Sequence, residues 1–281
     1  MPNNHAPAAK LNEIAAGFGS AWLDDTARGL LLRMDPRTRR VIARIPVQGN
    51  ANIAAGAGAM WAIESSKPAY ELTGPLLRID PRTNRVTARI ALRTTAGRPF
   101  VAWEVIARDD LVWLIGPDGL LRVDPSANRI IKAMALGAGG EVSDATLLGP
   151  DLWILMADGR LIRFDARSGA RMATVHAALV GDLVAARDAL IVLGDNEVAR
   201  VDLATGRALW RARVRPVTGA GAAVADERVW VPTGDRLVGL DPLDGHAVAS
   251  VDLGEFGATG VRRVGSELWL ATAGGHLVIL R

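Results

Sequence analysis

The chain has 281 residues, of which 49% are hydrophobic, a formal net charge of +3 and no cysteine. This composition predicts a well-packed globular protein and excludes a disordered chain, disulfides and thiolate metal sites. No apolar run approaches the roughly 18 residues that cross a bilayer, so we expect no membrane span. The arginines are spread along the chain without a basic tract, so we expect no nucleic-acid partner.

The N-terminal segment MPNNHAPAAKLNE has no basic stretch followed by an apolar run, so no signal peptide is visible as the chain is written. We therefore predict a cytoplasmic protein, or an exported one if the chain is a domain cut from a larger protein. We also expect a monomer.

One phrase recurs six times along the chain. It reads LLRMDPRTRRVIARIPV from Leu31, LLRIDPRTNRVTARIAL from Leu76 and LLRVDPSANRIIKAMAL from Leu120, and weaker copies begin at Arg160, Glu197 and Arg236. The step between its aspartates is 37 to 45 residues, which is typical of a repeat architecture. Those aspartates are Asp35, Asp80, Asp124, Asp165, Asp202 and Asp241.

Each repeat contains three recognisable short strands and an inferred fourth, separated by Gly, Asp and Pro. No window has a sustained helical period, so helix content should be near nil. Four short antiparallel strands in about 40 residues are typical of one blade of a β-propeller. The sequence therefore predicts an all-β, seven-bladed propeller as a single domain over residues 1–281.

Taken in chain order, the predicted blades are 12–47, 52–92, 103–137, 143–176, 181–214, 220–253 and 259–281. A tryptophan marks the second strand of six blades, and Ile191 takes that place in the fifth; the tryptophans are Trp22, Trp61, Trp113, Trp153, Trp230 and Trp269. The seventh blade ends after its third strand. Residues 5–11 are the candidate for its missing outermost strand, which would close the propeller.

Most repeated residues are best interpreted as structural. The aspartates should begin tight turns by accepting backbone N–H bonds, and the marker tryptophans and Trp210 should pack in the core. Asp24 and Asp25 should lie in a solvated loop. The arginines of the third strands should lie on the outward face: Arg33, Arg78, Arg122, Arg163 and Arg200.

An apolar residue of each first strand lies eight residues before the marker residue, and we call it the first-strand anchor. Because the first strands of a propeller line its central channel, the residues just before these anchors should converge on one end of that channel, and we call them the mouth positions. They are Glu13, Asn52, Glu104, Asp144, Asp182, Gly221 and Gly260. Packed carboxylates raise one another's pKa unless a cation or donor compensates them. The pattern therefore indicates a Mg²⁺ or Ca²⁺ site, a cationic ligand or an acid for proton transfer, and the alternative is a solvated rim. The predicted metal ligands are Glu13, Glu104, Asp144 and Asp182.

Two long connections should reach the same face. The interval from marker Trp to turn Asp is 19 residues in blade two, against 11 to 13 elsewhere, and the insertion is ESSKPAYELTGP, residues 64–75. The second is RTTAGRPF, residues 93–100, which leads to Trp103. Loops on a rigid scaffold often bind ligands, although a tolerated surface insertion is the alternative. The predicted ligand contacts are Glu64, Lys67, Tyr70, Arg98, Trp103 and Asn52.

The phrase LLRIDPRTNRVTARI resembles the YVTN-type and virginiamycin B lyase-like propellers of bacteria, and DLATGRALWRARV, residues 202–214, is similar to the PQQ-like repeat. The resemblance implies the fold and leaves the function open, because such families include lyases, lactonase-like enzymes and binding scaffolds. Quinone-dependent members of the PQQ class typically have eight blades and cysteines, so we expect no PQQ, and we expect no haem or nucleotide.

The leading prediction is a propeller that binds a small molecule or a protein at its acidic mouth. The alternative is a divalent-metal-dependent lyase or lactonase-like enzyme at the same mouth, with Glu104, Asp144 and Tyr70 as catalytic candidates. The third is a scaffold for protein interactions without channel chemistry.

Overall fold

The computed structural model describes residues 11–48, 52–64, 74–117, 119–136, 141–177, 179–217, 219–254, 257–272 and 274–281. The chain divides into two compact units, one of residues 1–137 and 274–278 and the other of residues 138–273 and 279–281. Within the described residues every regular element is a strand except one short 3-10 helix, η1 (Thr26–Arg28). The predicted all-β class is confirmed.

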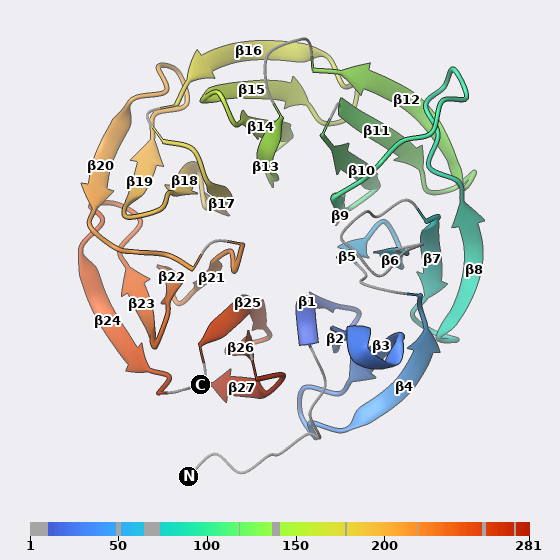
Figure 1. Ribbon diagram of the computed structural model, residues 1–281, viewed down its shortest axis with the longest axis horizontal. Coiled ribbons are helices and arrows are strands. Elements are labelled where there is room, and N and C mark those ends of the chain that lie inside the picture. The colour runs from blue at the N-terminus through green and yellow to red at the C-terminus, as the bar shows by residue number, and fades with distance from the viewer. Residues whose placement is uncertain are drawn as a thin grey trace. The chain divides into compact units, whose positions relative to one another are not determined.

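The first unit contains three four-stranded antiparallel sheets, in each of which the strands pair in chain order (Figure 1). Blade one is β1 (Leu11–Gly17), β2 (Ser20–Asp25), β3 (Leu30–Met34) and β4 (Val41–Pro46). Blade two is β5 (Asn52–Gly56), β6 (Ala59–Ile63), β7 (Leu76–Asp80) and β8 (Arg85–Ile90). Blade three is β9 (Glu104–Arg108), β10 (Leu111–Gly116), β11 (Gly119–Asp124) and β12 (Arg129–Ala135).

The second unit contains three more such sheets and the first strands of a seventh. Blade four is β13 (Val142–Leu148), β14 (Asp151–Met156), β15 (Arg160–Asp165) and β16 (Arg171–His176). Blade five is β17 (Asp182–Ala186), β18 (Ala189–Leu193), β19 (Val198–Val201) and β20 (Ala208–Ala212). Blade six is β21 (Ala223–Ala225), β22 (Arg228–Thr233), β23 (Arg236–Leu240) and β24 (Ala247–Asp252).

Blade seven has three strands within the described residues: β25 (Ala258–Val264), β26 (Glu267–Thr272) and β27 (Leu277–Leu280). With these seven antiparallel meanders, the predicted seven-bladed β-propeller is confirmed. The predicted closing strand, residues 5–11, lies outside the described residues except for Leu11, whose backbone pairs with Asp25 in blade one. The prediction of a single domain stays a prediction.

The marker residues lie in the second strand of each blade and form the core, as predicted. All six tryptophans are at most 7% exposed, and Ile191 is fully buried in the fifth blade. Trp61 belongs to a cluster that joins blades two and three, in which it packs with Val105, Leu114 and Leu121. Burial of such large side chains supplies most of the favourable free energy of folding.

The repeated aspartates close the turns between the third and fourth strands, as predicted. The Asp35 carboxylate accepts the backbone N–H groups of Arg37 (2.7 Å) and Thr38 (3.1 Å), and the other five make equivalent bonds. These bonds stabilise the ionised form, so the N–H groups of Thr38 and Arg37 hold the pKa of Asp35 below its usual value. The repeated phrase is therefore scaffold.

The predicted exposure of Asp24 and Asp25 is wrong. Asp24 and Asp25 end strand β2 and are 0% and 1% exposed, where a solvated loop was expected. The Asp24 carboxylate accepts the Thr26 hydroxyl (2.7 Å), and Asp25 forms an ion pair with Arg28 (2.8 Å). Buried carboxylates need such partners, and here the short helix η1 brings them back over the strand end.

Candidate functional site

The mouth positions of the first unit connect one blade to the next. The Glu13 carboxylate accepts the side-chain amide of Asn52 (3.2 Å) through one oxygen and the backbone N–H of Ile53 (2.9 Å) through the other. Asn52 in turn accepts the N–H of Val105 through its side-chain oxygen (2.6 Å). Ile53 and Val105 are the first-strand anchors of blades two and three. Each polar side chain therefore satisfies the anchor N–H of the following blade.

The second unit repeats this arrangement with two aspartates. Asp144 accepts its neighbour Ala145 N–H through Oδ1 (2.7 Å) and Leu183 N–H, the anchor of blade five, through Oδ2 (2.5 Å). Asp182 accepts the N–H of Gly219 (3.1 Å), just before blade six. The side chains at four mouth positions thus act as blade-to-blade latches, a name we use for Glu13, Asn52, Asp144 and Asp182.

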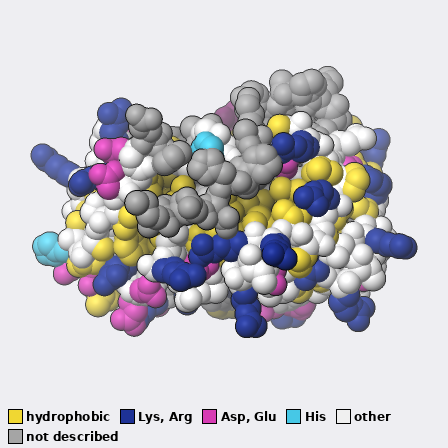
Figure 2. Space-filling model, turned by 90° about the horizontal axis from the view of Figure 1, so that it is seen from below, with side chains coloured by type: hydrophobic (Ala, Val, Ile, Leu, Met, Phe, Trp, Pro, Cys, Tyr) yellow, Lys and Arg dark blue, Asp and Glu magenta, His cyan; other side chains and the backbone are white. Residues whose placement is uncertain are grey.

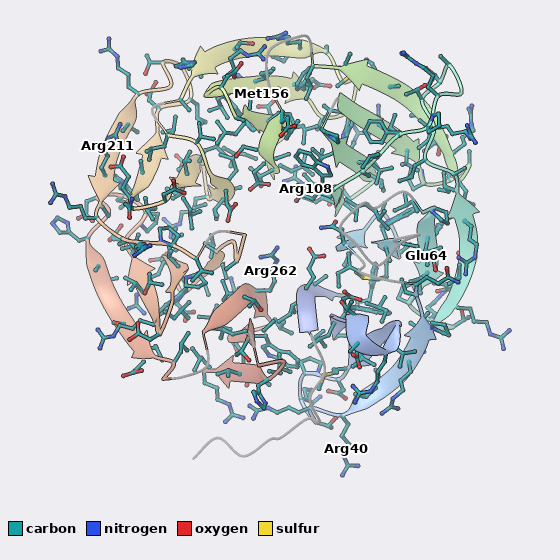
Figure 3. The ribbon with its side chains drawn as sticks, in the orientation of Figure 1. Arg40, Glu64, Arg108, Met156, Arg211 and Arg262 are labelled. Atoms are coloured by element: carbon teal, nitrogen blue, oxygen red, sulfur yellow. The ribbon has the colours of Figure 1, made fainter. Side chains whose placement is uncertain are left out.

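The second-unit latches have unusual electrostatics. Burial raises the pKa of Asp144 to about 7, the Leu183 N–H opposes the rise and the Asp182 carboxylate adds to it. Burial also raises the pKa of Asp182, against the N–H groups of Gly219 and Gly221. The positive charge of Arg262, which extends from β25 (Figure 3), lowers both values. These carboxylates therefore already have an internal cation and backbone donors.

The predicted metal ligands fall two in each unit, with Glu13 and Glu104 in the first and Asp144 and Asp182 in the second. Glu104 is half-buried at the start of β9, where its backbone pairs with Ile115. In the parts of the chain that the structure describes, no group of three or more His, Cys, Asp or Glu side chains is placed to hold a metal ion. Binding of Mg²⁺ or Ca²⁺ stays a prediction.

Glu64 closes the base of the blade-two insertion. Its side chain is buried (5% exposed), pairs with Arg89 of β8 (2.5 Å) and accepts the backbone N–H of Gln48 (3.1 Å). Its backbone holds the two ends of the loop together, because its N–H donates to the Pro75 carbonyl and its own carbonyl accepts the N–H of Gly74. Glu64 is thus a clamp at the base of the loop. The predicted contacts Lys67 and Tyr70 lie outside the described residues.

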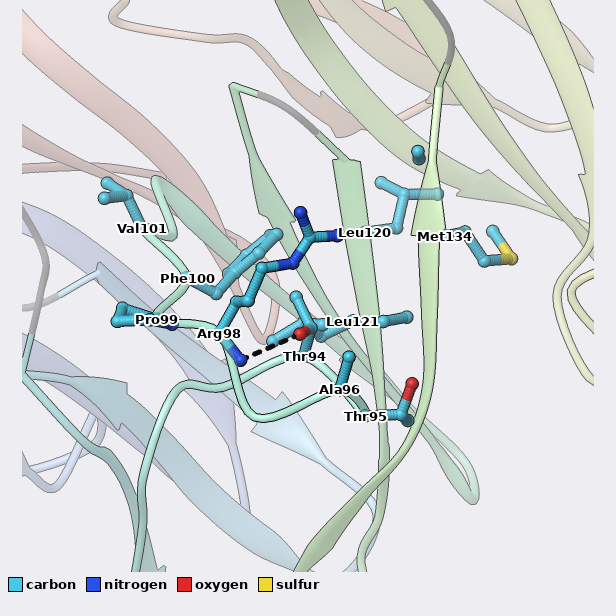
Figure 4. A pocket seen from close by; sticks show the side chains of 12 residues that line it. Thr94, Thr95, Ala96, Arg98, Pro99, Phe100, Val101, Leu120, Leu121 and Met134 are labelled. Carbon is cyan, nitrogen blue, oxygen red and sulfur yellow. Dashed lines mark hydrogen bonds between the residues drawn. The ribbon is translucent and has the colours of Figure 1, made fainter.

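The connection from blade two to blade three, residues 93–103, is a small ordered hairpin. Arg93 and Pro99 form an isolated β-bridge, and the backbone N–H of Thr94 bonds to the carbonyl of Arg98 (2.8 Å). The Thr94 hydroxyl accepts the N–H of Arg98 (3.2 Å), the bond drawn dashed in Figure 4. At the other end, the N–H of Trp103 bonds to the Ile115 carbonyl (2.7 Å). Both predicted contacts in this connection, Arg98 and Trp103, therefore stand on a rigid support.

This hairpin covers part of blade three and borders a partly open cavity of about 570 Å³ (Figure 4). Its walls come from the hairpin and from β11 and β12. Arg98, which the sequence predicts as a ligand contact at the mouth, lines this cavity, and its binding of a ligand stays a prediction. The sequence pattern does not single out Phe100, Leu120 or Met134. The last two lie within copies of the repeated phrase, where nothing in the pattern distinguishes a cavity wall from ordinary blade packing.

The third-strand arginines were predicted to face outward, and this is wrong. They are half-buried, and four stack over the tryptophan directly across the sheet, with Arg33 5.0 Å from the Trp22 ring centroid. Arg33 also donates to Asn84 Oδ1 (2.8 Å) and to the Pro81 carbonyl in the turn of blade two. The cation–π contacts therefore lie within single blades, whereas the hydrogen bonds of Arg33, Arg78 and Arg200 reach the turn of the next blade. Their fixed position two residues before each turn aspartate is the signal that could have indicated this.

Basic side chains are dispersed over the face shown in Figure 2, among acidic and apolar ones. In the described part of the chain, no helix has the length and apolar character required to cross a membrane.

Comparisons with known proteins place this arrangement among the propellers. The family described as "Outer membrane protein assembly factor BamB" matches residues 27–279. No protein in the curated set matches the chain.

The similar solved structures share the fold at low sequence identity. BamB from Moraxella catarrhalis is 15% identical, with a TM-score of 0.66 over 96% of this chain and 85% of that one. The Kuenenia stuttgartiensis hydrazine synthase is 11% identical, with a TM-score of 0.72 over 100% and 97%. The Cps50 (Swd1) β-propeller domain of Myceliophteria thermophila is also 11% identical, with a TM-score of 0.77 over 98% and 97%. At such identities the likeness concerns the fold alone.

Proposed function

Because the chain belongs to the family of the outer membrane protein assembly factor BamB, we propose that it is a protein-binding scaffold and that its partner acts in outer membrane protein assembly. The observation that carries the proposal is Trp103, a large aromatic side chain that is 37% exposed on the connection between blades two and three. Such a role would favour the exported setting, the second of the two predicted localisations.

Trp103 has the properties of an interaction anchor. It lies outside the marker register, so blade packing does not require it. Its backbone is fixed to Ile115, so little conformational entropy is lost when a partner covers the ring. Tryptophan and arginine are the side chains most enriched at the energetic centres of protein interfaces, and Arg98 stands on the same hairpin.

The acidic mouth has a different role in this proposal. The four latches use their oxygens on the next blade, so they support the scaffold and leave recognition to the hairpin. The enzyme alternative has one observation in its favour, the raised pKa of Asp144, which suits proton transfer near neutral pH. Both oxygens of that carboxylate, however, already accept backbone N–H groups. We therefore keep the metal-dependent lyase or lactonase as the second candidate.

The test compares the proteins that co-purify with three forms of the tagged chain after cross-linking in its native cells. The forms are the wild type, Trp103→Ala and the control Met172→Ala, which removes an apolar side chain that is 58% exposed on β16. We expect at least one protein to be retained by the wild type and the control and to be depleted about tenfold or more by Trp103→Ala. Identical partners for all three forms would overturn the proposal.

A further inference from the structure

The cavity under the hairpin has the size of a small-molecule site. Its volume of about 570 Å³ lies within the roughly 300–1,000 Å³ of typical ligand pockets. Its walls include Phe100 from the hairpin, Leu120 and Leu121 from β11, and Met134 from β12. Leu120 and Leu121 are fully buried behind the wall, so the apolar surface that a ligand can reach comes from Phe100 and Met134, beside a comparable polar surface. An apolar body would therefore gain free energy by leaving water and entering this space.

The roof of the cavity is preorganised. Besides the bonds at Thr94, the Arg93 guanidinium donates to the Gly97 carbonyl (2.9 Å), and the N–H of Phe100 bonds to Leu92 (3.0 Å). A side chain at Gly116 would collide with the Phe100 ring and the Val101 carbonyl, so the hairpin lies close against the end of β10. A ligand would not have to order this loop, which favours binding.

Among the described residues that line the cavity, one is charged, and its charge is positive. Arg98 is the only charged residue among those that line it, and Thr94 and Thr95 add hydroxyl groups. Within the described ranges no carboxylate pairs with the Arg98 guanidinium, and Figure 4 shows this side chain extending from the hairpin toward Leu120. Arginine is always ionised and presents two parallel donors that match the two oxygens of a carboxylate.

We propose that this cavity binds a small apolar molecule that carries a single carboxylate. The apolar part lies against the partly exposed side chains of Phe100 and Met134, and the carboxylate accepts two hydrogen bonds from Arg98. One guanidinium compensates one charge, which selects a monoanion over a phosphate dianion. The volume of about 570 Å³ is that of a site for a free small molecule. This proposal goes beyond the protein-binding function, with which it shares the hairpin and Arg98.

The test measures binding of decanoate to the purified protein by titration calorimetry, with decanol as the uncharged control of equal chain length. We expect decanoate to bind to the wild type and to bind roughly tenfold or more weakly to Arg98→Ala, the loss expected for one charge-assisted pair. Arg98→Lys should keep part of the affinity, since it keeps the charge without the two-pronged geometry. The binding of decanol should differ little between the wild type and either Arg98 variant.

Two further variants separate this site from general effects. Arg85→Ala removes an exposed arginine of the same unit outside the cavity and should leave decanoate binding unchanged. Thr95→Trp adds a large side chain at the cavity wall and leaves Arg98 in place, so it should weaken the binding of both decanoate and decanol. The proposal is overturned if decanoate does not bind, or if it binds equally to Arg98→Ala. It is also overturned if a trileucine peptide with a free C-terminus binds where decanoate does not. Because no protein partner is present, these outcomes are independent of the scaffold proposal.

Discussion

The raised pKa of the latch residue Asp144 predicts how the free energy of unfolding depends on pH. Its pKa is about 7 in the folded protein and 3.8 by ordinary value, so the folded state holds a proton more tightly than the unfolded state does. The resulting stabilisation is complete below about pH 4 and is lost as the pH rises through 7. The wild type should therefore lose about 2.7 kcal/mol of its free energy of unfolding between pH 5 and pH 8, because pH 5 lies two units below the folded pKa. This is an upper value, because the side chain is only half-buried.

The variant Asp144→Asn cannot ionise and should not show this loss. We expect its free energy of unfolding, relative to the wild type, to rise by about 2–3 kcal/mol from pH 5 to pH 8, even if the lost acceptor costs about 1 kcal/mol at every pH. The assay is guanidinium unfolding at several pH values, followed by tryptophan fluorescence. If the difference between the variant and the wild type stays constant from pH 5 to 8, the reasoning is refuted.

The matched control is Asp202→Asn, in a turn of the repeated phrase. There the hydroxyl and the N–H of Thr205 lower the pKa of the carboxyl. Its contribution to stability is therefore present above about pH 4 and is lost only as the pH falls through its lowered value. This control should show no change relative to the wild type between pH 5 and 8, which separates the latch from a general effect of removing an aspartate.

Three more substitutions test the account of the scaffold, each by chemical unfolding. Arg33→Ala should cost about 2–3 kcal/mol because it removes a stacked guanidinium and its bonds to blade two, whereas Arg37→Ala on an exposed turn should cost less than about 0.5 kcal/mol. Gly116→Ala should cost about 1–3 kcal/mol because the new methyl group collides with the hairpin, whereas Gly257→Ala, whose Cβ would meet its nearest neighbour at 3.6 Å, should cost under about 1 kcal/mol. Glu64→Gln should cost about 1–3 kcal/mol, since it removes the charge of a buried carboxylate that pairs with the exposed Arg89 and accepts the N–H of Gln48; equal midpoints for it and the wild type would contradict the clamp.

The fold could be predicted because the residues that determine its strands and turns recur in every repeat. The turn aspartates and marker tryptophans return at nearly constant spacing, and each depends on local chemistry: a carboxylate that accepts nearby N–H groups, or an aromatic ring in the second strand. Repeats of this kind can be aligned with one another, so a residue such as Ile191 is recognised from its place even though its type differs.

The candidate site was harder to predict, because the hydrogen-bond partners of its side chains are backbone groups that no residue type identifies. The acids at Asp144 and Asp182 were correctly placed at the first strands, but their acceptor role depends on backbone N–H groups of the next blade, which every residue type except proline carries. The stacked position of Arg33 was missed for a related reason. Strand alternation says which face a side chain is on, and it does not say whether a neighbouring blade covers that face.

The central claim is that this propeller binds a protein through the connection between blades two and three. Site-specific photo-cross-linking tests it most directly, with a photoreactive phenylalanine at Trp103 and, separately, at the control position Met172 in the native cell. We predict a discrete adduct with one protein at position 103 and none with that protein at position 172. Absence of an adduct at position 103, or the same adducts at both positions, would contradict the claim.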